Sequence, residues 1–383
     1  MKILAIETSC DDTGIAILQA SRRWASTEFK VLANIVSSQQ IHAQYGGVFP
    51  SMAKREHQRN LVPVLTQALK KSGLLIRENK HLKSQIKTLK KILEKESELY
   101  EFTKSFLETH EKPDIDMIVV THGPGLEPCL WVGVNFAKAL SFAWNIPVIP
   151  VNHIEGHILV NFLENKKIYF PAISLVVSGG HTQLILVKKV GSYKIIGETK
   201  DDAAGECFDK AARILGLGYP GGPIISKIAE KWDGRRASIL LPRPMMHSKD
   251  YDFSFSGLKT AVLYKVRDLQ NRTTDSSMVL NKNIVGGMCV EVQQAIIDVL
   301  IKKTLSAAKD YKVKTIILGG GVSANSELRR QFQISNFKFQ ILFPQKELST
   351  DNALMIAVAG YFHKTKKIAW QKLSVNANLR VGK

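Results

Sequence analysis

The feature that most constrains the fold is a strand–turn–strand pattern that occurs twice. Residues 3–18 have the pattern of an apolar strand, a polar turn and a second apolar strand, and residues 173–187 repeat this design at almost the same length. Helical patterns alternate with further apolar strands, predicted near residues 31–37, 117–121, 148–151, 193–196 and 315–318. Such alternation is typical of α/β proteins in which helices cover mixed sheets. We therefore predict a duplicated α/β lobe with a cleft between the two copies.

The length of 383 residues suits two large lobes, which we place at residues 1–150 and 151–383. Residues 76–112 contain neither Gly nor Pro, and their apolar positions from Leu82 to Leu107 follow a broken heptad. This predicts a helical insertion in the first lobe. Basic residues precede acidic ones in it, so one continuous helix would oppose its own dipole and an antiparallel hairpin is favoured. The alternative is a solvated helix without a partner.

The charge balance indicates the kind of partner. The chain carries 53 Lys and Arg against 34 Asp and Glu, a formal charge of +19. This excess favours a polyanion, nucleic acid before a membrane surface, because no basic amphipathic anchor is evident. Residues 352–383 contain no acidic residue and six basic ones: Lys364, Lys366, Lys367, Lys372, Arg380 and Lys383. A polyanion could lie along this stretch, and the alternative is a mobile basic tail.

Compartment and membrane association follow from simpler patterns. No run of about 18 uncharged apolar residues occurs, so we expect no membrane-spanning role. The four cysteines lie far apart without a C-x-x-C pair, which argues against a disulfide scaffold and a cysteine zinc site. The first predicted strand begins almost at the N-terminus, without the pattern of a secretory leader. We expect a cytoplasmic protein.

Three glycine-containing turns follow predicted strands. The turn ETSCDDTG at 7–14 combines hydroxyls and carboxylates, and SGGHT at 178–182 leaves its backbone open to a ligand. GGGVSAN at 319–325 precedes a helix whose N-terminus can hold a phosphate. Each turn alone is more often structural than functional. Together, with two of them in duplicated positions, they predict a nucleotide site between the lobes.

The most specific local pattern is NHIEGHI at 152–158. His153 and His157 are four residues apart, so on a helix they share one face and can share a metal ion, whereas the alternative is a chance exposed pair. A third ligand could be Asp351, at the start of the last long helix, or this residue is only a helix cap. Glu155 suggests a metallopeptidase base. The peptidase pattern is H-E-x-x-H, however, and Glu155 is rotated by about 200° from His153, away from the metal face.

A set of motifs in fixed order carries a family resemblance: ETSCDDTGIA, YGGVFPSMAKREH, GPGL, NHIEGH, LVVSGGHTQL, DDAAGECFDKAARILGLGYPGGP, DFSFSGLKTA, GGGVSAN and STDNA. With them the chain resembles the TsaD family, tRNA threonylcarbamoyladenosine transferases formerly called O-sialoglycoprotein endopeptidases. The resemblance covers residues 1–375 except 76–112. It implies an α/β, actin-like ATPase fold of two duplicated lobes, similar to sugar kinases and Hsp70, with an inserted helical segment.

The resemblance also implies the reaction. Members transfer a threonylcarbamoyl group from threonylcarbamoyl-AMP to the exocyclic amine of the adenosine adjacent to the anticodon, in tRNAs that read ANN codons. The tRNA would account for the basic charge. Accessory subunits similar to TsaB and TsaE are expected partners. The alternatives are a metal-dependent peptidase and a nonenzymatic ATP-dependent scaffold, the latter supported only by the glycine turns.

Site residues are carried over by position. His153, His157 and Asp351 are similar to the ligands of one divalent metal ion, Fe²⁺ or Zn²⁺. The positions similar to those that bind the adenylate donor are Val176, Val177, Ser178, Gly179, Gly180, Asp209, Gly222 and Asn325. The ATPase fold that the resemblance implies also suggests ATP with Mg²⁺ as a further ligand. We predict that Asp11 orients or deprotonates the incoming amine.

Two departures from the family pattern concern the catalytic turn and the partner surface. Many bacterial relatives have Glu where this chain has Asp12, which is shorter by one methylene. After GPGL, small residues are replaced by Glu127, Pro128 and Trp131, on a helix that helps to form the partner interface in bacterial relatives. Partner contacts are therefore expected to differ.

Overall fold

Two five-stranded mixed sheets form the framework of the computed structural model, which describes residues 1–23, 26–78, 85–164, 167–232, 239–271, 282–335 and 338–382. The first sheet has the order β3-β2-β1-β4-β5 and the second β10-β9-β6-β7-β8. In each sheet three strands form an antiparallel meander and two more add in parallel to its first strand. The two sheets thus share one topology, as the repeated hairpin predicts.

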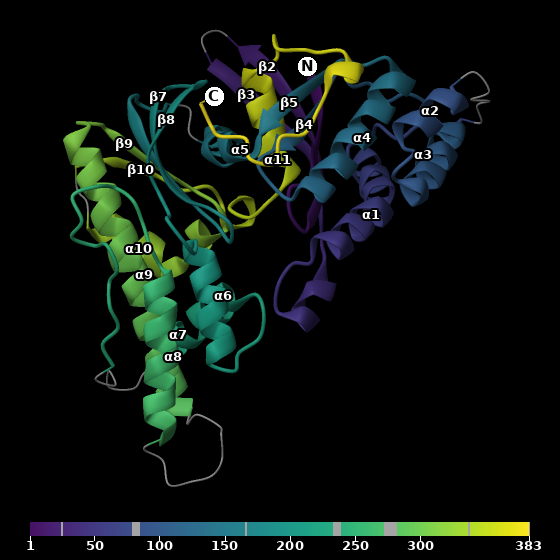
Figure 1. Ribbon diagram of the computed structural model, residues 1–383. Coiled ribbons are helices and arrows are strands. Elements are labelled where there is room, and N and C mark those ends of the chain that lie inside the picture. The colour runs from purple at the N-terminus through teal and green to yellow at the C-terminus, as the bar shows by residue number, and fades with distance from the viewer. Residues whose placement is uncertain are drawn as a thin grey trace.

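The strands of the first sheet are β1 (Lys2–Glu7), β2 (Asp12–Arg23), β3 (Ser26–Ser38), β4 (Met117–Gly123) and β5 (Val148–Asn152). Those of the second are β6 (Ala172–Val177), β7 (Thr182–Lys189), β8 (Ser192–Glu198), β9 (Thr315–Gly319) and β10 (Gln340–Leu342). Helices cover both sheets on both faces (Figure 1).

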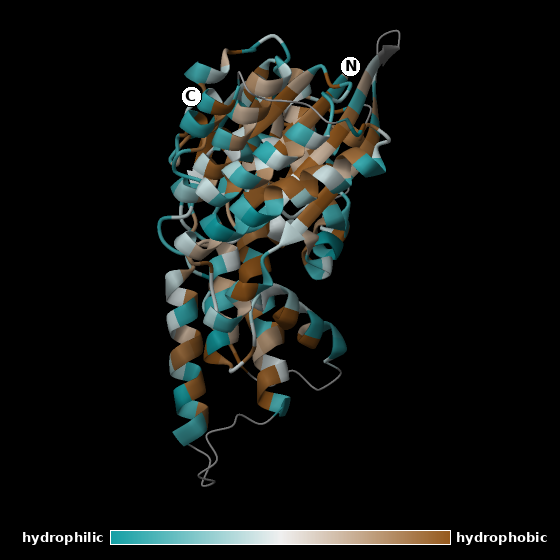
Figure 2. Ribbon diagram, turned by 90° about the vertical axis from the view of Figure 1, so that its right-hand side faces the viewer, coloured by the Kyte–Doolittle hydropathy of each residue, from teal (hydrophilic) through white to brown (hydrophobic). Residues whose placement is uncertain are grey.

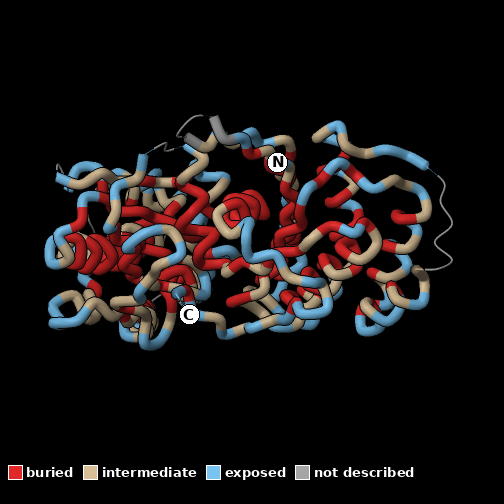
Figure 3. The backbone as a smooth tube through the Cα atoms, turned by 90° about the horizontal axis from the view of Figure 1, so that it is seen from above, coloured by how far each residue is buried: buried red, intermediate tan, exposed pale blue. Residues whose placement is uncertain are grey.

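Three hydrophobic cores define the layers. The first core joins the first sheet to α1 (Pro50–Lys71) and α4 (Glu127–Trp144). The central core encloses α5 (His153–Leu159) and α11 (Ala353–Phe362) between the two sheets. The third core joins the second sheet to its outer helices, which are α6 (Ala204–Ile214), α7 (Gly221–Lys231), α8 (Ser256–Asn271), α9 (Lys282–Asp310) and α10 (Ser326–Ile334). Buried segments accordingly run through the middle of the molecule, and exposed ones follow its rim (Figure 3).

Strand β1 shows how the sequence builds these layers. Leu4 and Ile6 pack into the core that contains α1 and α4, while Ile3 and Ala5 face α11. Successive side chains of a strand point to opposite faces, so a strand covered on both sides must be apolar throughout. Hydrophobic residues are concentrated in the strands, whereas the outer helices alternate hydrophobic and hydrophilic residues (Figure 2).

The described part of segment 76–112 contains α2 (Ile86–Ile92) and α3 (Ser97–Thr109), which confirms the predicted helical insertion there. Leu89 and Leu99 are buried in the same core as α1 and α4, so the alternative of a solvated helix without a partner is wrong. Glu98 pairs with Arg59 of α1 at 3.0 Å. Leu82, the first residue of the predicted heptad, lies outside the described residues.

The C-terminal stretch packs against the first lobe. Ile368 forms an antiparallel bridge with Val148 of β5, Leu373 is buried, and the backbone N–H of Asn376 donates to the carbonyl of His122. For the described part of this stretch, these contacts show that the alternative of a mobile tail is wrong. Its basic residues Lys364, Lys366, Lys367, Lys372 and Arg380 are exposed, and Lys383 lies outside the described residues.

Helix α9 is long and apolar enough to cross a bilayer by length and composition alone. In its most apolar window 67% of the residues are buried inside the protein. Its side chains pack into the third core, so it has the character of a core helix.

Candidate metal centre and its surroundings

The parallel strands of the first sheet bring distant residues to one edge. Ile6 of β1 pairs with Val120 of β4, and Thr121 pairs with Val151 of β5. The carboxyl ends of these strands therefore meet, which in α/β sheets is where ligands bind. Helix α5 starts at this edge because Asn152 caps it, its side-chain oxygen accepting from the backbone N–H of Ile154 at 2.8 Å.

Helix α5 presents His153 and His157 to Asp351. Nε2 of His153 lies 3.5 Å and Nε2 of His157 lies 3.2 Å from Oδ1 of Asp351. One potential ligand atom from each residue lies within 4.8 Å of the others. The two histidines are 5% and 1% exposed, so they are not an exposed chance pair. The cap of α11 is Asn352, whose side-chain oxygen accepts from Met355 N at 3.2 Å, so Asp351 is not the cap.

The donor set fits a divalent transition metal. Among the residues that the structure describes, no hydrogen-bond partner is found for either buried ring nitrogen of His157, although Nε2 lies 3.2 Å from the Asp351 carboxylate. Buried polar atoms normally find such a partner. Two imidazoles and one carboxylate that converge on one point are a recurrent ligand set for zinc and nonhaem iron.

The charges around His153 favour a cation. Burial disfavours the imidazolium, but Asp351 and Glu7 raise the pKa of His153 to about 9. Burial likewise opposes ionisation of Asp351 and Glu7, yet the facing His153 lowers the pKa of both carboxyls. Burial lowers the pKa of His157. Two carboxylates thus flank one imidazole, an arrangement in which a metal ion can replace a proton.

The first glycine turn also reaches this site. A Cβ at Gly14 would lie 2.9 Å from the backbone N of Ala353, so the strand after the turn touches the start of α11. Burial, reinforced by the charge of Asp351, raises the pKa of Asp11 and raises that of Asp12 to about 7. Asp12, which the sequence singled out only as a departure, therefore titrates near neutrality.

The other two glycine turns adjoin each other and α5. Val176 of β6 pairs with Gly319 of β9, and a Cβ at Gly320, where φ is +85°, would lie 2.4 Å from Val177 O. A Cβ at Gly319 would lie 2.6 Å from His157 O. Helix α6 begins against the other turn, with Gly205 N donating to Ser178 O at 3.1 Å. Only glycine permits these close approaches.

Two predicted donor-binding side chains have structural partners. Oδ1 of Asp209 accepts from the backbone N–H of Gly221 at 2.7 Å, where α7 begins and Gly222 follows. Asn325 caps α10 by accepting from Leu328 N at 3.0 Å. Any ligand contact of these side chains would be additional to that role.

Comparison with known proteins places this chain in a family. The family model described as tRNA N6-adenosine threonylcarbamoyltransferase (TsaD) matches residues 30–82 and 98–358. A protein of that name from Thermosipho africanus is 43% identical over 364 residues, 94% of each chain. Another, from Chromobacterium violaceum, is 42% identical over 363 residues, 94% of this chain and 92% of that one. The chain belongs to the tRNA N6-adenosine threonylcarbamoyltransferase family.

The fold class is confirmed as well. Full-length HypF in its phosphate- and nucleotide-bound form is 12% identical, with a TM-score of 0.52 over 96% of this chain and 47% of HypF. At this identity the likeness concerns the fold alone. With the duplicated sheets it assigns the two-lobed α/β fold of actin-like ATPases, with an inserted helical segment. Between its two matched stretches the family model leaves 83–97 unmatched, and these residues belong to that segment and include α2.

Membership of this family disfavours the peptidase alternative, and so does the setting of Glu155. Its Oε1 accepts from the Tyr193 hydroxyl at 2.7 Å and its Oε2 contacts Nε2 of His363 at 2.7 Å. Glu155 is 5% exposed, and its contacts with Tyr193 and His363 connect α5 to β8 and to the end of α11. A general base for a bound water would need a free carboxylate oxygen on the metal side.

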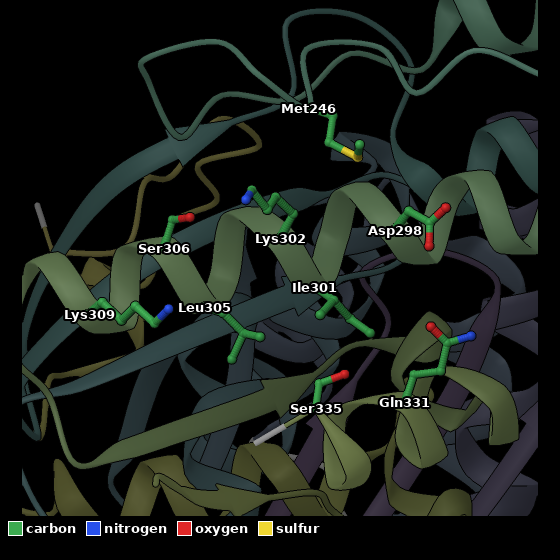
Figure 4. A pocket seen from close by; sticks show the side chains of 9 residues that line it. All are labelled: Met246, Asp298, Ile301, Lys302, Leu305, Ser306, Lys309, Gln331 and Ser335. Atoms are coloured by element: carbon green, nitrogen blue, oxygen red, sulfur yellow. The ribbon is translucent and has the colours of Figure 1, made fainter. Parts of the chain in front are cut away.

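A separate depression of about 420 Å³ lies in the second lobe, between α9, the end of α10 and the loop that carries Met246 (Figure 4). Lys302 and Lys309 extend from α9 along it (Figure 4). It contains none of the predicted site residues.

Two residues of the candidate site escaped sequence reasoning. Glu7, 0% exposed, contacts His153 Nδ1 at 3.2 Å through Oε2, and Thr121 donates to the same oxygen at 2.6 Å. A carboxylate that directly follows the apolar residues 3–6 of a buried strand is the signal that could have identified Glu7. Nothing in the local sequence distinguishes Thr121.

Proposed function

We propose that this chain transfers the threonylcarbamoyl group of threonylcarbamoyl-AMP to N6 of the adenosine adjacent to the anticodon in tRNAs that read ANN codons. The observation that carries the proposal is the convergence of His153, His157 and Asp351 beside the glycine turns, in a chain of this family. The formal charge of +19 suits a tRNA substrate.

The metal part of the proposal assigns His153 and His157 through Nε2, and Asp351 through its carboxylate, as ligands of one ion, either Fe²⁺ or Zn²⁺. When bound there, such an ion supplies Lewis acidity and a template for the donor. The buried, unpartnered nitrogens of His157 support this assignment.

The donor part assigns the turn at Val176, Val177, Ser178, Gly179 and Gly180, with Asp209, Gly222 and Asn325, to the adenylate. No side chain obstructs Gly179 or Gly180, because a Cβ at either would meet nothing within 4 Å. Backbone amides of such turns hold phosphate groups well. We propose that the same turns hold the AMP that leaves, and that ATP with Mg²⁺ is a further ligand.

The acceptor part concerns proton transfer. The adenosine amine attacks the carbamoyl carbon, a C–N bond forms, the bond to the phosphate oxygen breaks, and one proton of the amine must be removed. Asp11 is proposed to orient the amine, because its carboxylate lies in the first turn within the field of Asp351. Burial raises the pKa of the neighbouring Asp12 to about 7, which suits a proton acceptor.

The assembly part concerns accessory subunits similar to TsaB and TsaE. On α4, Trp131 donates to Glu127 at 3.4 Å and lies under Lys138 Nζ, 5.3 Å from the ring centroid. We propose that this polar and aromatic stripe is the partner surface in which the chain departs from relatives. The proposed compartment is the cytoplasm, where the four free cysteines would stay reduced.

The test is mass spectrometry of tRNA from a strain depleted of this protein. We expect threonylcarbamoyladenosine to fall on depletion and to return with the wild-type chain but not with His157→Ala. Unchanged levels on depletion would contradict the proposal. Full complementation by a folded His153→Ala variant would instead favour the nonenzymatic scaffold, and hydrolysis abolished by Glu155→Ala would favour the peptidase.

A further inference from the structure

The proposed reaction leaves one buried charge unused. Glu7 ends β1, the middle strand of the first sheet, and is 0% exposed. An unpaired carboxylate at such depth is strongly unfavourable, so a buried one is expected to have specific partners. Those of Glu7 converge on the candidate metal centre.

Two hydrogen bonds hold the carboxylate in place. Its Oε1 accepts from the backbone N–H of Ser9 at 2.6 Å, and its Oε2 accepts from the Thr121 hydroxyl at 2.6 Å. Ser9 belongs to the turn that follows β1, while Thr121 lies in the neighbouring strand β4, near its carboxyl end. The orientation of Glu7 is therefore set by the strand register rather than by solvent.

The same oxygen that Thr121 holds faces the ring of His153. Oε2 lies 3.2 Å from Nδ1, and Ser9 Oγ lies 3.1 Å from Nδ1, while Nε2 on the other side faces Asp351. A carboxylate can only accept, so it favours the tautomer with the proton on Nδ1. That tautomer leaves the lone pair of Nε2 directed towards Asp351, as a metal ligand requires.

The two histidines differ in this support. Within the described part of the chain, Nδ1 of His157 has no hydrogen-bond partner, whereas Nδ1 of His153 has both Glu7 and Ser9 beside it. Of the two histidines, His153 is therefore the one whose ring Glu7 contacts directly.

We propose that Glu7 is a positioning residue that fixes the ring and tautomer of His153 so that Nε2 serves as a metal ligand. This inference rests on the metal site proposed above. Thr121 and Ser9 hold Glu7 in turn, so the support extends across β1 and β4 to the start of α5. Carboxylates that hold a ligating imidazole in this way typically raise metal affinity 10–100-fold.

The test measures affinity for Zn²⁺ alone, by competition with a chromophoric chelator, on the full chain stripped of metal. Glu7→Gln keeps the shape, and its amide oxygen must take the Oε1 position to accept from the Ser9 N–H. The amide nitrogen then replaces Oε2, where it can donate to the Thr121 hydroxyl but cannot accept from Nδ1 of His153. We expect its affinity to fall about 10–100-fold. We also expect the visible spectrum of the Co²⁺-loaded variant to change, which a merely structural loss would not cause.

The matched control is Glu155→Gln, which removes another buried carboxylate, on α5 itself, away from the ligands. It is expected to retain wild-type affinity and spectrum. Thr121→Val removes one support of Glu7 and should lower affinity in the same direction by less. It decides the matter if Glu7→Gln does not fold.

Three results would overturn the inference. They are wild-type affinity and spectrum in Glu7→Gln, an equal loss in Glu155→Gln, or, where Glu7→Gln does not fold, unchanged affinity in Thr121→Val. If the wild-type chain itself binds no ion, the proposed metal site fails and the inference fails with it. If the wild type binds and Glu7→Gln binds equally well, the metal site stands and only the role of Glu7 is lost.

Discussion

The carboxylates of Asp11 and Asp12, in the turn after β1, are partly buried, and burial disfavours their charged form. Asp12 is the clearest case, because burial, followed by the charges of Asp351, Asp11 and Glu7, outweighs its bond to Ser38 and raises its pKa to about 7. Such a residue costs folding free energy at neutral pH, and proteins accept that cost mostly at functional sites. The cost can be measured.

We predict that Asp12→Asn stabilises the metal-free protein at pH 8. The folded pKa of about 7 exceeds the ordinary 3.8, so the stability contributed by protonated Asp12 is present at low pH and is lost as pH rises from about 4 to 7. Asparagine mimics the protonated form. The gain in unfolding free energy at pH 8 should be about 1–3 kcal/mol and should vanish near pH 4. Urea titrations at both pH values measure it, and a variant less stable than wild type at pH 8 would refute the prediction.

Among the elements, α11 shows how closely a helix must approach a sheet for the site to form. A Cβ at Gly360 would lie 2.5 Å from both methyl carbons of Val119 in β4, and one at Gly156 of α5 would lie 3.0 Å from Ile356. Helix α11, which begins just after Asp351, thus packs on β4 near its C-terminal end and also on α5, which carries both histidines.

We predict that Gly360→Ala destabilises the fold and weakens metal binding together. Overpacking of this kind costs about 1–3 kcal/mol, and the displaced α11 would move Asp351 away from the histidines. The double variant with Val119→Ala should recover part of both losses, since it removes the clashing methyl groups. Thermal unfolding and Zn²⁺ titration of the three variants give the comparison. Additive losses in the double variant would show that the two residues do not clash.

What the sequence can predict depends on how local the signal is. The hairpins β1–β2 and β6–β7 follow from apolar runs around polar turns, and His153 with His157 follows from helical spacing. Helix α7 was not expected, because its first residues, Gly-Gly-Pro, have the composition of a turn. Helix α8 buries only Leu258, Val262 and Val266, too sparse an apolar face to stand out.

Long-range parts of the site have no local signal. The sequence around Asp351 left open whether it is a third ligand or a helix cap, and only the family resemblance favoured the ligand. The contact of Glu7 with His153 depends on the parallel register of β1, β4 and β5, which no periodicity reveals. The insertion was predicted as helical, but its burial against α1 and α4 arises from tertiary packing.

At the scale of the whole molecule, two features support the proposed function: the duplicated sheets and the excess of positive charge. The two sheets share one strand order, and the last helix returns to the first sheet. Because α11 belongs to the second half of the chain but packs on the first sheet, the boundary between the lobes at residue 150 stays a prediction. The exposed lysines after α11 lie at the surface of the first lobe, and Lys364 Nζ lies 4.4 Å from the ring centroid of Tyr361.

We predict that replacing Lys364, Lys366 and Lys367 by Gln weakens tRNA binding and lowers the salt dependence of the affinity. Each lost phosphate contact should reduce the slope of log K against log salt by about 0.7–0.9. The matched control replaces Lys249, Lys302 and Lys309. Lys302 and Lys309 line the depression between α9 and α10, Lys249 lines a second depression beside α9, and this variant should leave the slope nearly unchanged. Filter binding over a salt series measures both. Equal effects of the two triple variants would mean that the tail has no special role.

The central claim is that one ion, held by His153, His157 and Asp351, is needed for transfer to tRNA. Its most direct test is a titration of metal-stripped protein with Zn²⁺ or Fe²⁺, with formation of threonylcarbamoyladenosine on tRNA measured at each addition. The account predicts that wild-type activity rises from near zero and saturates at one ion per chain, while a folded Asp351→Ala variant stays inactive. Full activity in stripped wild type, or in Asp351→Ala, would contradict it.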